Sequence, residues 1–272
     1  MAVARNRLSL LRPRTVREAL RLLAGAPLTP IAGCTDVYVG LQFGTVAATR
    51  FLDLWGLDEL RGIRRADGGL RIGALTTYTD IITSRLVQTQ VPMLTAAARE
   101  IGGRQIQNRG TLGGNIANAS PAGDTLPVLA AAGARIVLGR TGHERAVPMA
   151  DFYTGYRTSV RRRDELILAV EIPRLQGRQW WRKVGTRRAQ AISKVMMAGV
   201  RGDDVRLAVG AVGPTVIAAT GAARVLSAGG SLAAAQAALD AEIAPIDDLR
   251  STQDYRRTVA MNLLSQFWSD TA

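Results

Sequence analysis

Hydrophobic and polar positions follow two different periods along the chain. Between residues 15 and 24 apolar residues recur every three or four positions behind a threonine, which predicts an amphipathic helix with a capping box to Glu18. The segments on either side of residues 67–69 alternate with a period of two, which predicts a β-hairpin. The continuous apolar run of residues 166–172 is stopped by Pro173 and predicts a buried strand. Helical and strand patterns are therefore mixed, and the expected fold class is α+β.

The same patterns predict three consecutive units, residues 1–55, 56–175 and 176–272. The first should be βαβ-like, with the following elements: a strand at 29–31, a helix at 37–43 and a strand at 51–54. In the second unit a helix starts at Pro92, and residues 105–110 are expected to be extended. The third should hold antiparallel strands and alanine-rich helices, as follows: strands at 192–200 and 205–212, and helices at 218–226, 231–239 and 255–268.

Glycines, small residues and short polar side chains fill residues 111–124, which we expect to be neither helix nor strand. Gly113 and Gly114 permit positive φ and close approach of a ligand, and consecutive amides in such a turn can form an anion-binding nest. A short apolar helix is expected to follow at residues 125–133. A glycine loop leading into a helix is a usual way to hold a phosphate, although an ordinary glycine-rich surface loop has the same composition.

A second small-residue turn, residues 30–37, precedes the predicted helix near the N-terminus. It also carries a hydroxyl and a carboxylate, at Thr35 and Asp36. Neither turn is a Walker A loop or a dinucleotide fingerprint, because the required glycine and lysine spacings are missing. Two such turns in one chain predict one long ligand that is held from two sides.

Cysteine and histidine occur once each, as Cys34 and His143. An internal disulfide, a cysteine-ligated iron–sulphur cluster and a zinc finger are therefore excluded from this chain. His143 lies in a predicted hairpin turn, so we expect no catalytic side chain and no metal ligand. Any redox chemistry would require a bound cofactor.

The formal net charge of +13 comes almost wholly from arginine, since Lys183 and Lys194 are the only lysines. Such a charge invites a nucleic-acid-binding interpretation, but the arginines are scattered and no aromatic platform accompanies them. A basic nucleotide- or nucleic-acid-binding module stays open as an alternative. No apolar run approaches the roughly 18 residues of a membrane span, and no signal peptide is recognisable, so the cytoplasm is the expected location.

Five segments in a fixed order resemble the FAD-binding medium subunit of the molybdenum hydroxylase family, of the xanthine dehydrogenase and carbon monoxide dehydrogenase type. They cover nearly the whole chain and are residues 32–36, 70–77, 105–115, 164–173 and 255–257. The resemblance implies a two-part FAD-binding domain of the vanillyl-alcohol-oxidase/PCMH type. Its small βαβ-like subdomain would be residues 1–55 and its larger mixed α/β subdomain residues 56–175, followed by a C-terminal antiparallel sheet with a helical bundle.

The same resemblance implies an electron-transfer subunit of a heterotrimeric enzyme. A large partner would hold a molybdenum–pterin cofactor and a small partner two [2Fe-2S] clusters, with FAD in this chain passing electrons to NAD, a quinone or another acceptor. A dimer of heterotrimers is implied as well. A stand-alone FAD-dependent oxidoreductase of the same fold remains the enzymatic alternative.

Carried over position by position, the resemblance places Asp124 toward the adenosine end of FAD and Ile101 beside the isoalloxazine ring. Lys183 near the flavin would favour its anionic reduced form. The implied FAD contacts are Ile31, Ala32, Gly33, Cys34, Thr35, Asp36, Val37, Ile101, Thr111, Leu112, Gly113, Gly114, Asn115, Asn118, Asp124, Ile167 and Lys183. Ile101 and Ile167 could equally be core residues, and Lys183 a surface charge.

Cys34 stands where the family usually has glycine. If this position requires a positive φ, a cysteine there would strain the loop by about 1–3 kcal/mol.

Overall fold

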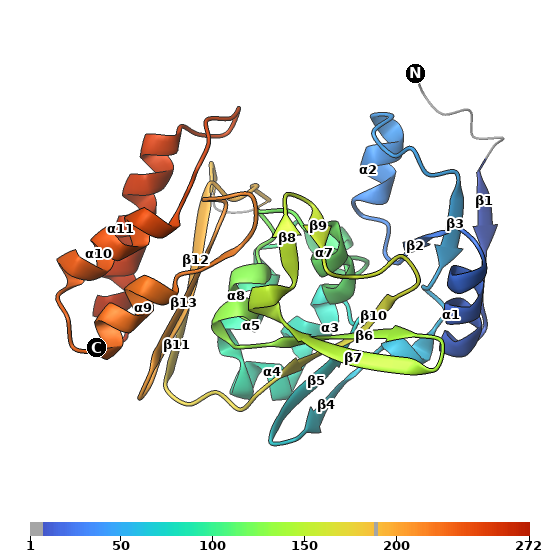
Figure 1. Ribbon diagram of the computed structural model, residues 1–272, viewed down its shortest axis with the longest axis horizontal. Helices are drawn as coiled ribbons and strands as arrows, with labels where there is room; N and C mark the ends of the chain where they lie inside the picture. The colour runs from blue at the N-terminus through green and yellow to red at the C-terminus, as the bar shows by residue number, and fades with distance from the viewer. Residues whose placement is uncertain (1–7, 188–189) are drawn as a thin grey trace.

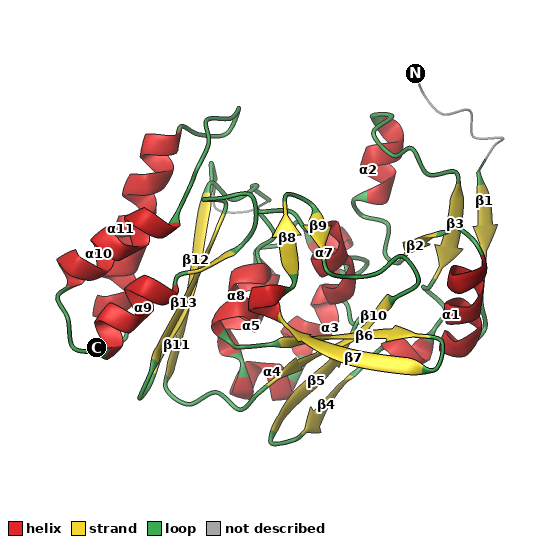
Figure 2. Ribbon diagram, viewed as in Figure 1, coloured by secondary structure: helices red, strands yellow, loops and turns green. Residues whose placement is uncertain are grey.

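The computed structural model describes residues 8–187 and 190–272, which form three sheets side by side (Figure 1, Figure 2). The first is a parallel sheet in the order β1-β3-β2, joined by two helices. Its elements are β1 (Ser9–Leu11), α1 (Val16–Gly25), β2 (Thr29–Ile31), α2 (Val37–Gln42) and β3 (Arg50–Asp53). The predicted βαβ-like unit is thus present. Strand β1 was not predicted, because all three of its residues are exposed and give no alternation.

The second sheet is antiparallel, in the order β4-β5-β10-β6-β7. Its strands are β4 (Ile63–Ala66), β5 (Gly69–Gly73), β6 (Arg135–Arg140), β7 (His143–Pro148) and β10 (Leu166–Ile172). The predicted hairpin and the predicted buried strand are confirmed, and His143 is exposed at the β6–β7 turn. The apolar run of β10 is buried on both faces, because its side chains enter two different core clusters.

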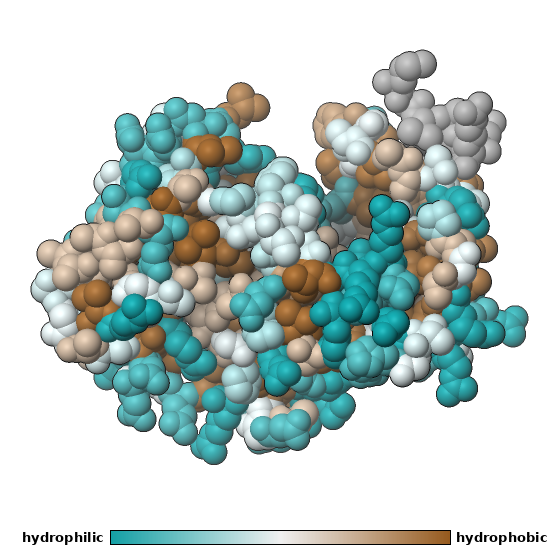
Figure 3. Space-filling model, in the orientation of Figure 1, coloured by the Kyte–Doolittle hydropathy of each residue, from teal (hydrophilic) through white to brown (hydrophobic). Residues whose placement is uncertain are grey.

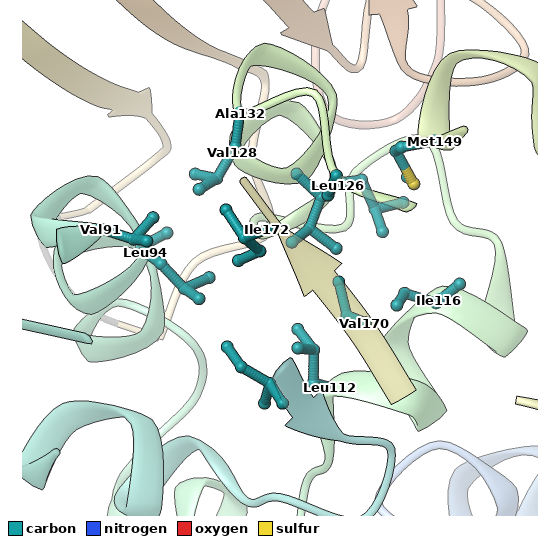
Figure 4. Close-up of a cluster of buried hydrophobic side chains, with 14 of the residues drawn as sticks. Val91, Leu94, Leu112, Ile116, Leu126, Val128, Ala132, Met149, Val170 and Ile172 are labelled. Carbon is teal, nitrogen blue, oxygen red and sulfur yellow. The ribbon is translucent and has the colours of Figure 1, made fainter. Parts of the chain in front are cut away.

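Six short helices belong to this region. They are α3 (Tyr78–Thr83), α4 (Arg85–Gln90), α5 (Pro92–Arg99), α6 (Arg104–Gln107), α7 (Leu112–Asn118) and α8 (Leu126–Ala131). Of these, α4 and α7 contact the second sheet, and α5 and α8 contact the third. Figure 4 shows how Leu112 and Ile116 of α7 and Leu126 of α8 gather around Val170 and Ile172 of β10. Two single turns, η2 (Asp58–Leu60) and η3 (Met149–Asp151), and a small hairpin, β8 (Tyr153–Gly155) with β9 (Thr158–Ser159), complete this part.

Two expectations about this region are wrong. Residues 112–118 form a helix, because Thr111 caps it by accepting a hydrogen bond from the Gly114 amide and because Leu112 and Ile116 bury one face. The left-handed residue is Ala119, which ends this helix at φ 52°, so Gly113 and Gly114 are both helical. The segment expected to be extended is also partly helical, as α6.

The third sheet is antiparallel, in the order β11-β12-β13-β14, and carries the C-terminal helices on one face (Figure 1). Its elements are β11 (Arg178–Val184), β12 (Val195–Arg201), β13 (Val205–Gly210), β14 (Ile217–Ala218), α9 (Thr220–Ser227), α10 (Leu232–Glu242) and α11 (Gln253–Asp270). Val195 and Met197 of β12 pack with these helices, whereas Ala198 and Val200 belong to the core of the middle region. Both faces of the sheet are therefore covered, and the predicted sheet with helices is confirmed. No helix in residues 8–187 or 190–272 is long and apolar enough to cross a membrane.

Candidate functional site

A cavity of about 1160 Å³ opens between the first unit and the rest of the molecule. Its lining comes from the loop after β2, from α7 and the loop behind it, from the segment before β10, and from the connection between α10 and α11. Figure 3 shows this face hollowed between the lobe that carries α2 and the larger body. The volume exceeds the usual 300–1,000 Å³ of small-molecule pockets, which favours an elongated ligand.

The structure brings nearly all of the predicted FAD contacts to this one cavity. Those that line it are Ile31, Ala32, Gly33, Cys34, Thr35, Asp36, Val37, Ile101, Thr111, Gly113, Gly114, Asn115, Asn118, Asp124 and Ile167. Leu112 does not, since its side chain is fully buried in the core. Lys183 also lies outside the lining and contacts Asp124.

At Gly33 the first predicted loop contacts the segment that leads into the second one. A Cβ atom at this position would lie 1.6 Å from the carbonyl oxygen of Arg109, so only glycine allows the first loop to press against the chain that leads into α7. Within the described residues, the amides of positions 33–36 donate to no protein acceptor. They are therefore available to an anionic ligand.

Cys34 adopts the left-handed conformation, with φ 62°. The condition for strain at this position is thus met, at a typical cost of about 1–3 kcal/mol. Its thiol donates a long hydrogen bond, 3.4 Å from Sγ to the Ala32 carbonyl oxygen. Burial, with a smaller effect of the Asp53 carboxylate, raises the pKa of the Cys34 thiol, which keeps it protonated at neutral pH.

The amides at the start of α7 serve the fold and form no nest, contrary to expectation. Those of Leu112 and Gly113 donate to the carbonyl oxygens of Thr76 and Ala74, at 3.1 and 2.8 Å. The next two donate to the side-chain and backbone oxygens of Thr111. What α7 can offer a ligand is consequently a side-chain donor.

Asp124 and Lys183 form a buried ion pair at the cavity wall. Nζ of Lys183 lies 2.7 Å from Oδ2 of Asp124, and the two side chains are only 5% and 9% exposed. The hydroxyl of Ser193 donates to Oδ1 at 2.5 Å. Burial raises the pKa of the Asp124 carboxyl, and the charge of Lys183 opposes that rise. Lys183 is therefore not a surface charge. The two residues were predicted to contact opposite ends of the ligand, but the structure places them side by side, with Asp124 lining the cavity and Lys183 behind it.

Ile101 and Ile167 were expected to be either ligand contacts or core residues, and the structure gives them both positions. Ile167 is 7% exposed and belongs to the core, and Ile101 packs against its margin, yet both line the cavity. They offer apolar surface on which a planar ring could lie.

Sequence reasoning missed several lining residues because only the tertiary structure brings them here. Arg157 donates from Nη1 to Oδ1 of Asn118, 2.8 Å away, and belongs to the β8–β9 hairpin. Arg256, 4% exposed, donates to the carbonyl oxygen of Ala211 and pairs with Asp248, which fixes the α10–α11 connection at the cavity. Arg256 is part of a segment that carried the family resemblance, and that was the only available signal for it.

The lining fits FAD. Free backbone amides and the guanidinium groups of Arg157 and Arg161 suit a pyrophosphate, and isoleucine side chains suit an aromatic ring system. Asn115 and Asn118 add short polar side chains between them.

Two family descriptions together match nearly the whole chain. Residues 6–175 match the FAD binding domain in molybdopterin dehydrogenase, and residues 180–271 match the CO dehydrogenase flavoprotein C-terminal domain. The glyceraldehyde dehydrogenase medium chain of Sulfolobus acidocaldarius is 36% identical over 211 residues, or 75% of each chain. The carbon monoxide dehydrogenase medium chain of Hydrogenophaga pseudoflava is 32% identical over 267 residues, or 93% of each chain.

Solved structures agree with this assignment. Carbon monoxide dehydrogenase from Hydrogenophaga pseudoflava, in a form that lacks the Mo-pyranopterin moiety of the molybdenum cofactor, gives a TM-score of 0.91 at 27% identity and covers 98% of this chain and 99% of that one. Quinoline 2-oxidoreductase from Pseudomonas putida 86 gives 0.89 at 26% identity, with coverage of 97% and 96%. With a matching cavity, matching family descriptions and matching folds, the chain belongs to the family of FAD-binding medium subunits of molybdenum hydroxylases.

Proposed function

We propose that this chain is the FAD-carrying electron-transfer subunit of a heterotrimeric molybdenum hydroxylase. It would accept electrons from [2Fe-2S] clusters of a small partner subunit and pass them to an external acceptor such as NAD or a quinone. Bound FAD would supply the redox chemistry, since the chain's own side chains offer only one thiol and one exposed imidazole. The observation that carries the proposal is the match of the FAD-binding family description over residues 6–175, combined with the cavity that those residues line.

One group of cavity residues would bind the pyrophosphate of FAD. The free amides of residues 33–36 would hold the pyrophosphate, and Gly33 would keep that loop pressed against Arg109. Arg157, already oriented by its hydrogen bond to Asn118, would add positive charge near the same ligand.

The isoleucines would act at the flavin, and the buried ion pair would form part of the cavity wall. Ile101 and Ile167 would pack on the ring and exclude water from it. Asp124 and Lys183 would form a polar wall whose two charges largely balance, 2.7 Å apart. The remaining predicted contacts line the same cavity, with the exception of Leu112.

The partners and the organisation of the chain belong to the same proposal. A large molybdopterin-binding subunit and a small [2Fe-2S] subunit would complete the enzyme, as a dimer of heterotrimers in the cytoplasm. We retain the division into FAD-binding subdomains at 1–55 and 56–175 and a C-terminal domain at 176–272. The three separate sheets and the separate family matches on either side of residues 176–179 support it.

The visible absorption spectrum of the purified chain, alone and after co-purification with its partners, tests this function. We expect flavin bands from the chain alone, FAD released on denaturation, and iron–sulphur absorbance only when partners are present. A colourless protein, even after incubation with FAD and with partners present, would exclude the proposal.

A further inference from the structure

Thr125 stands at the N-cap position of α8 but does not cap it. Threonine is usually found there because its hydroxyl accepts from an amide of the first turn, and α8 lacks any such side-chain hydrogen bond. Instead, the Thr125 hydroxyl donates to Oδ1 of Asn115 in α7, 2.7 Å away. Since Thr125 is fully buried, this side chain is committed to Asn115.

This hydrogen bond fixes the orientation of the Asn115 carboxamide. A threonine hydroxyl carries a single proton, and Thr125 donates it to Oδ1 of Asn115. The oxygen and the NH2 group of a carboxamide lie on opposite sides of its carbon, so the NH2 group of Asn115 points away from Thr125.

On its other side Asn115 faces the cavity. Its Nδ2 has no acceptor within the described residues, and Asn115 lines the cavity beside Gly114, which is exposed and has no side chain to obstruct a ligand. The backbone amides of residues 112–115 are all bound inside the protein. In this turn of α7, the Asn115 NH2 group is thus the donor that is available to a ligand.

We propose that Thr125 is a positioning residue for cofactor binding, which locks the Asn115 carboxamide so that its NH2 group meets an acceptor oxygen of FAD. This inference rests on the proposed function. Without the Thr125 hydroxyl, holding the carboxamide in this orientation would leave Oδ1 of Asn115 without its donor, a cost that the flavin-free protein avoids by turning the amide.

The test is a double-mutant cycle on the full chain, with FAD affinity measured by titration of flavin-free protein. Thr125→Val keeps the shape and removes the hydroxyl, and we expect about tenfold weaker FAD binding, equivalent to about 1.4 kcal/mol. Thr125→Ser restores the hydroxyl and should restore affinity. In an Asn115→Ala background, Thr125→Val should cause no further loss, because its effect runs through Asn115.

Thr95→Val is the matched control. Thr95, in α5, is also a buried threonine, 5% exposed, but its hydroxyl has no hydrogen-bond partner among the residues that the structure describes. Its replacement should leave FAD affinity unchanged, and thermal unfolding of each flavin-free variant reports whether the fold is retained.

The outcomes distinguish the positioning role from the flavoprotein assignment. Full affinity in Thr125→Val, or losses that simply add in the double variant, would overturn the positioning role and leave the flavoprotein assignment standing. A wild-type chain that binds no FAD would overturn both.

Discussion

At the scale of single residues, Gly33 is where the first ligand loop touches the segment that leads into α7. An alanine there would place its Cβ 1.6 Å from the Arg109 carbonyl oxygen, so the loop would have to move away. We expect Gly33→Ala to weaken FAD binding by at least about tenfold, a loss of about 1.4 kcal/mol, in a titration of flavin-free protein. Gly25→Ala is the control, because a Cβ there meets nothing within 4 Å. If the two variants bound FAD with equal affinity, the close contact between Gly33 and Arg109 would not be needed for binding.

The Asp124–Lys183 pair makes a second prediction at this scale. Asp124→Asn would leave the Lys183 ammonium group buried without a countercharge, and breaking such pairs typically costs about 3–5 kcal/mol of unfolding free energy. Replacing both residues with apolar ones, as in Asp124→Leu with Lys183→Met, should recover most of that loss. Urea denaturation of the flavin-free variants measures both effects.

Asp240 and Arg257 provide the comparison, as an ion pair at the surface with side chains 55% and 37% exposed. Asp240→Asn should cost less than about 1 kcal/mol. If Asp124→Asn proved equally mild, the buried pair would not contribute as described.

At the scale of elements, Glu165 ties the segment before β10 to β7. The guanidinium of Arg145 on β7 holds its carboxylate with two hydrogen bonds, at 2.7 and 2.9 Å, and the Arg162 amide adds a third at 2.7 Å. The hydrogen bond from Arg145 is the main cause that lowers the pKa of Glu165 below its usual value. The segment that reaches the cavity with Arg161 is fixed in this way.

Because the pKa of Glu165 is lowered, the stabilisation from its interaction with Arg145 depends on pH. A carboxylate whose folded pKa is depressed stabilises the fold at pH values above its unfolded pKa, about 4.3, and loses that contribution as pH falls through the folded value. We expect Glu165→Gln to unfold at a lower temperature than wild type at pH 7, with the gap shrinking in acid. Thermal unfolding across pH 3–7 is the measurement, and a constant gap would contradict the assignment.

Elements with a clear hydrophobic period could be predicted from sequence, and those with competing signals could not. The hairpin at β4–β5 and strand β10 show their burial directly in the pattern. Helix α7 contains two glycines and two asparagines, which favour irregular structure, but burial of Leu112 and Ile116 outweighs that preference.

Some residues of the candidate site could likewise be predicted from the sequence, and others could not. The first loop was recognisable because its small residues are contiguous, as in residues 31–37. Arg157 and the α10–α11 connection reach the cavity, and Thr125 reaches Asn115, only through tertiary packing, so nothing local marks them.

At the scale of the whole molecule, α2 stands apart from the rest of the fold (Figure 1). It buries none of its residues, and three large apolar side chains on it are exposed: Tyr38 by 71%, Val39 by 55% and Phe43, which follows it, by 77%. Residues 37–49 carry no charged side chain. Exposed apolar surface of this kind promotes association.

We therefore expect the chain purified without partners to self-associate, and Phe43→Ser to reduce that association in sedimentation velocity experiments. Leu249→Ser is the control, since Leu249 is fully exposed but stands between charged residues. A monomeric wild-type chain, or equal effects of the two variants, would contradict a specific contribution of the α2 surface.

The prevalence of arginine leaves the molecule with very few primary amines. Lys194 lies 4.8 Å from the Tyr255 ring and is partly exposed, whereas the Lys183 side chain is 5% exposed and bound to Asp124. An amine-selective reagent will therefore modify Lys194 before Lys183, and will reach Lys183 only when the wall formed by Asp124 opens. The rate at which Lys183 becomes labelled, followed by mass spectrometry, thus measures how often the cavity wall opens, and a ligand that holds the wall closed will slow it.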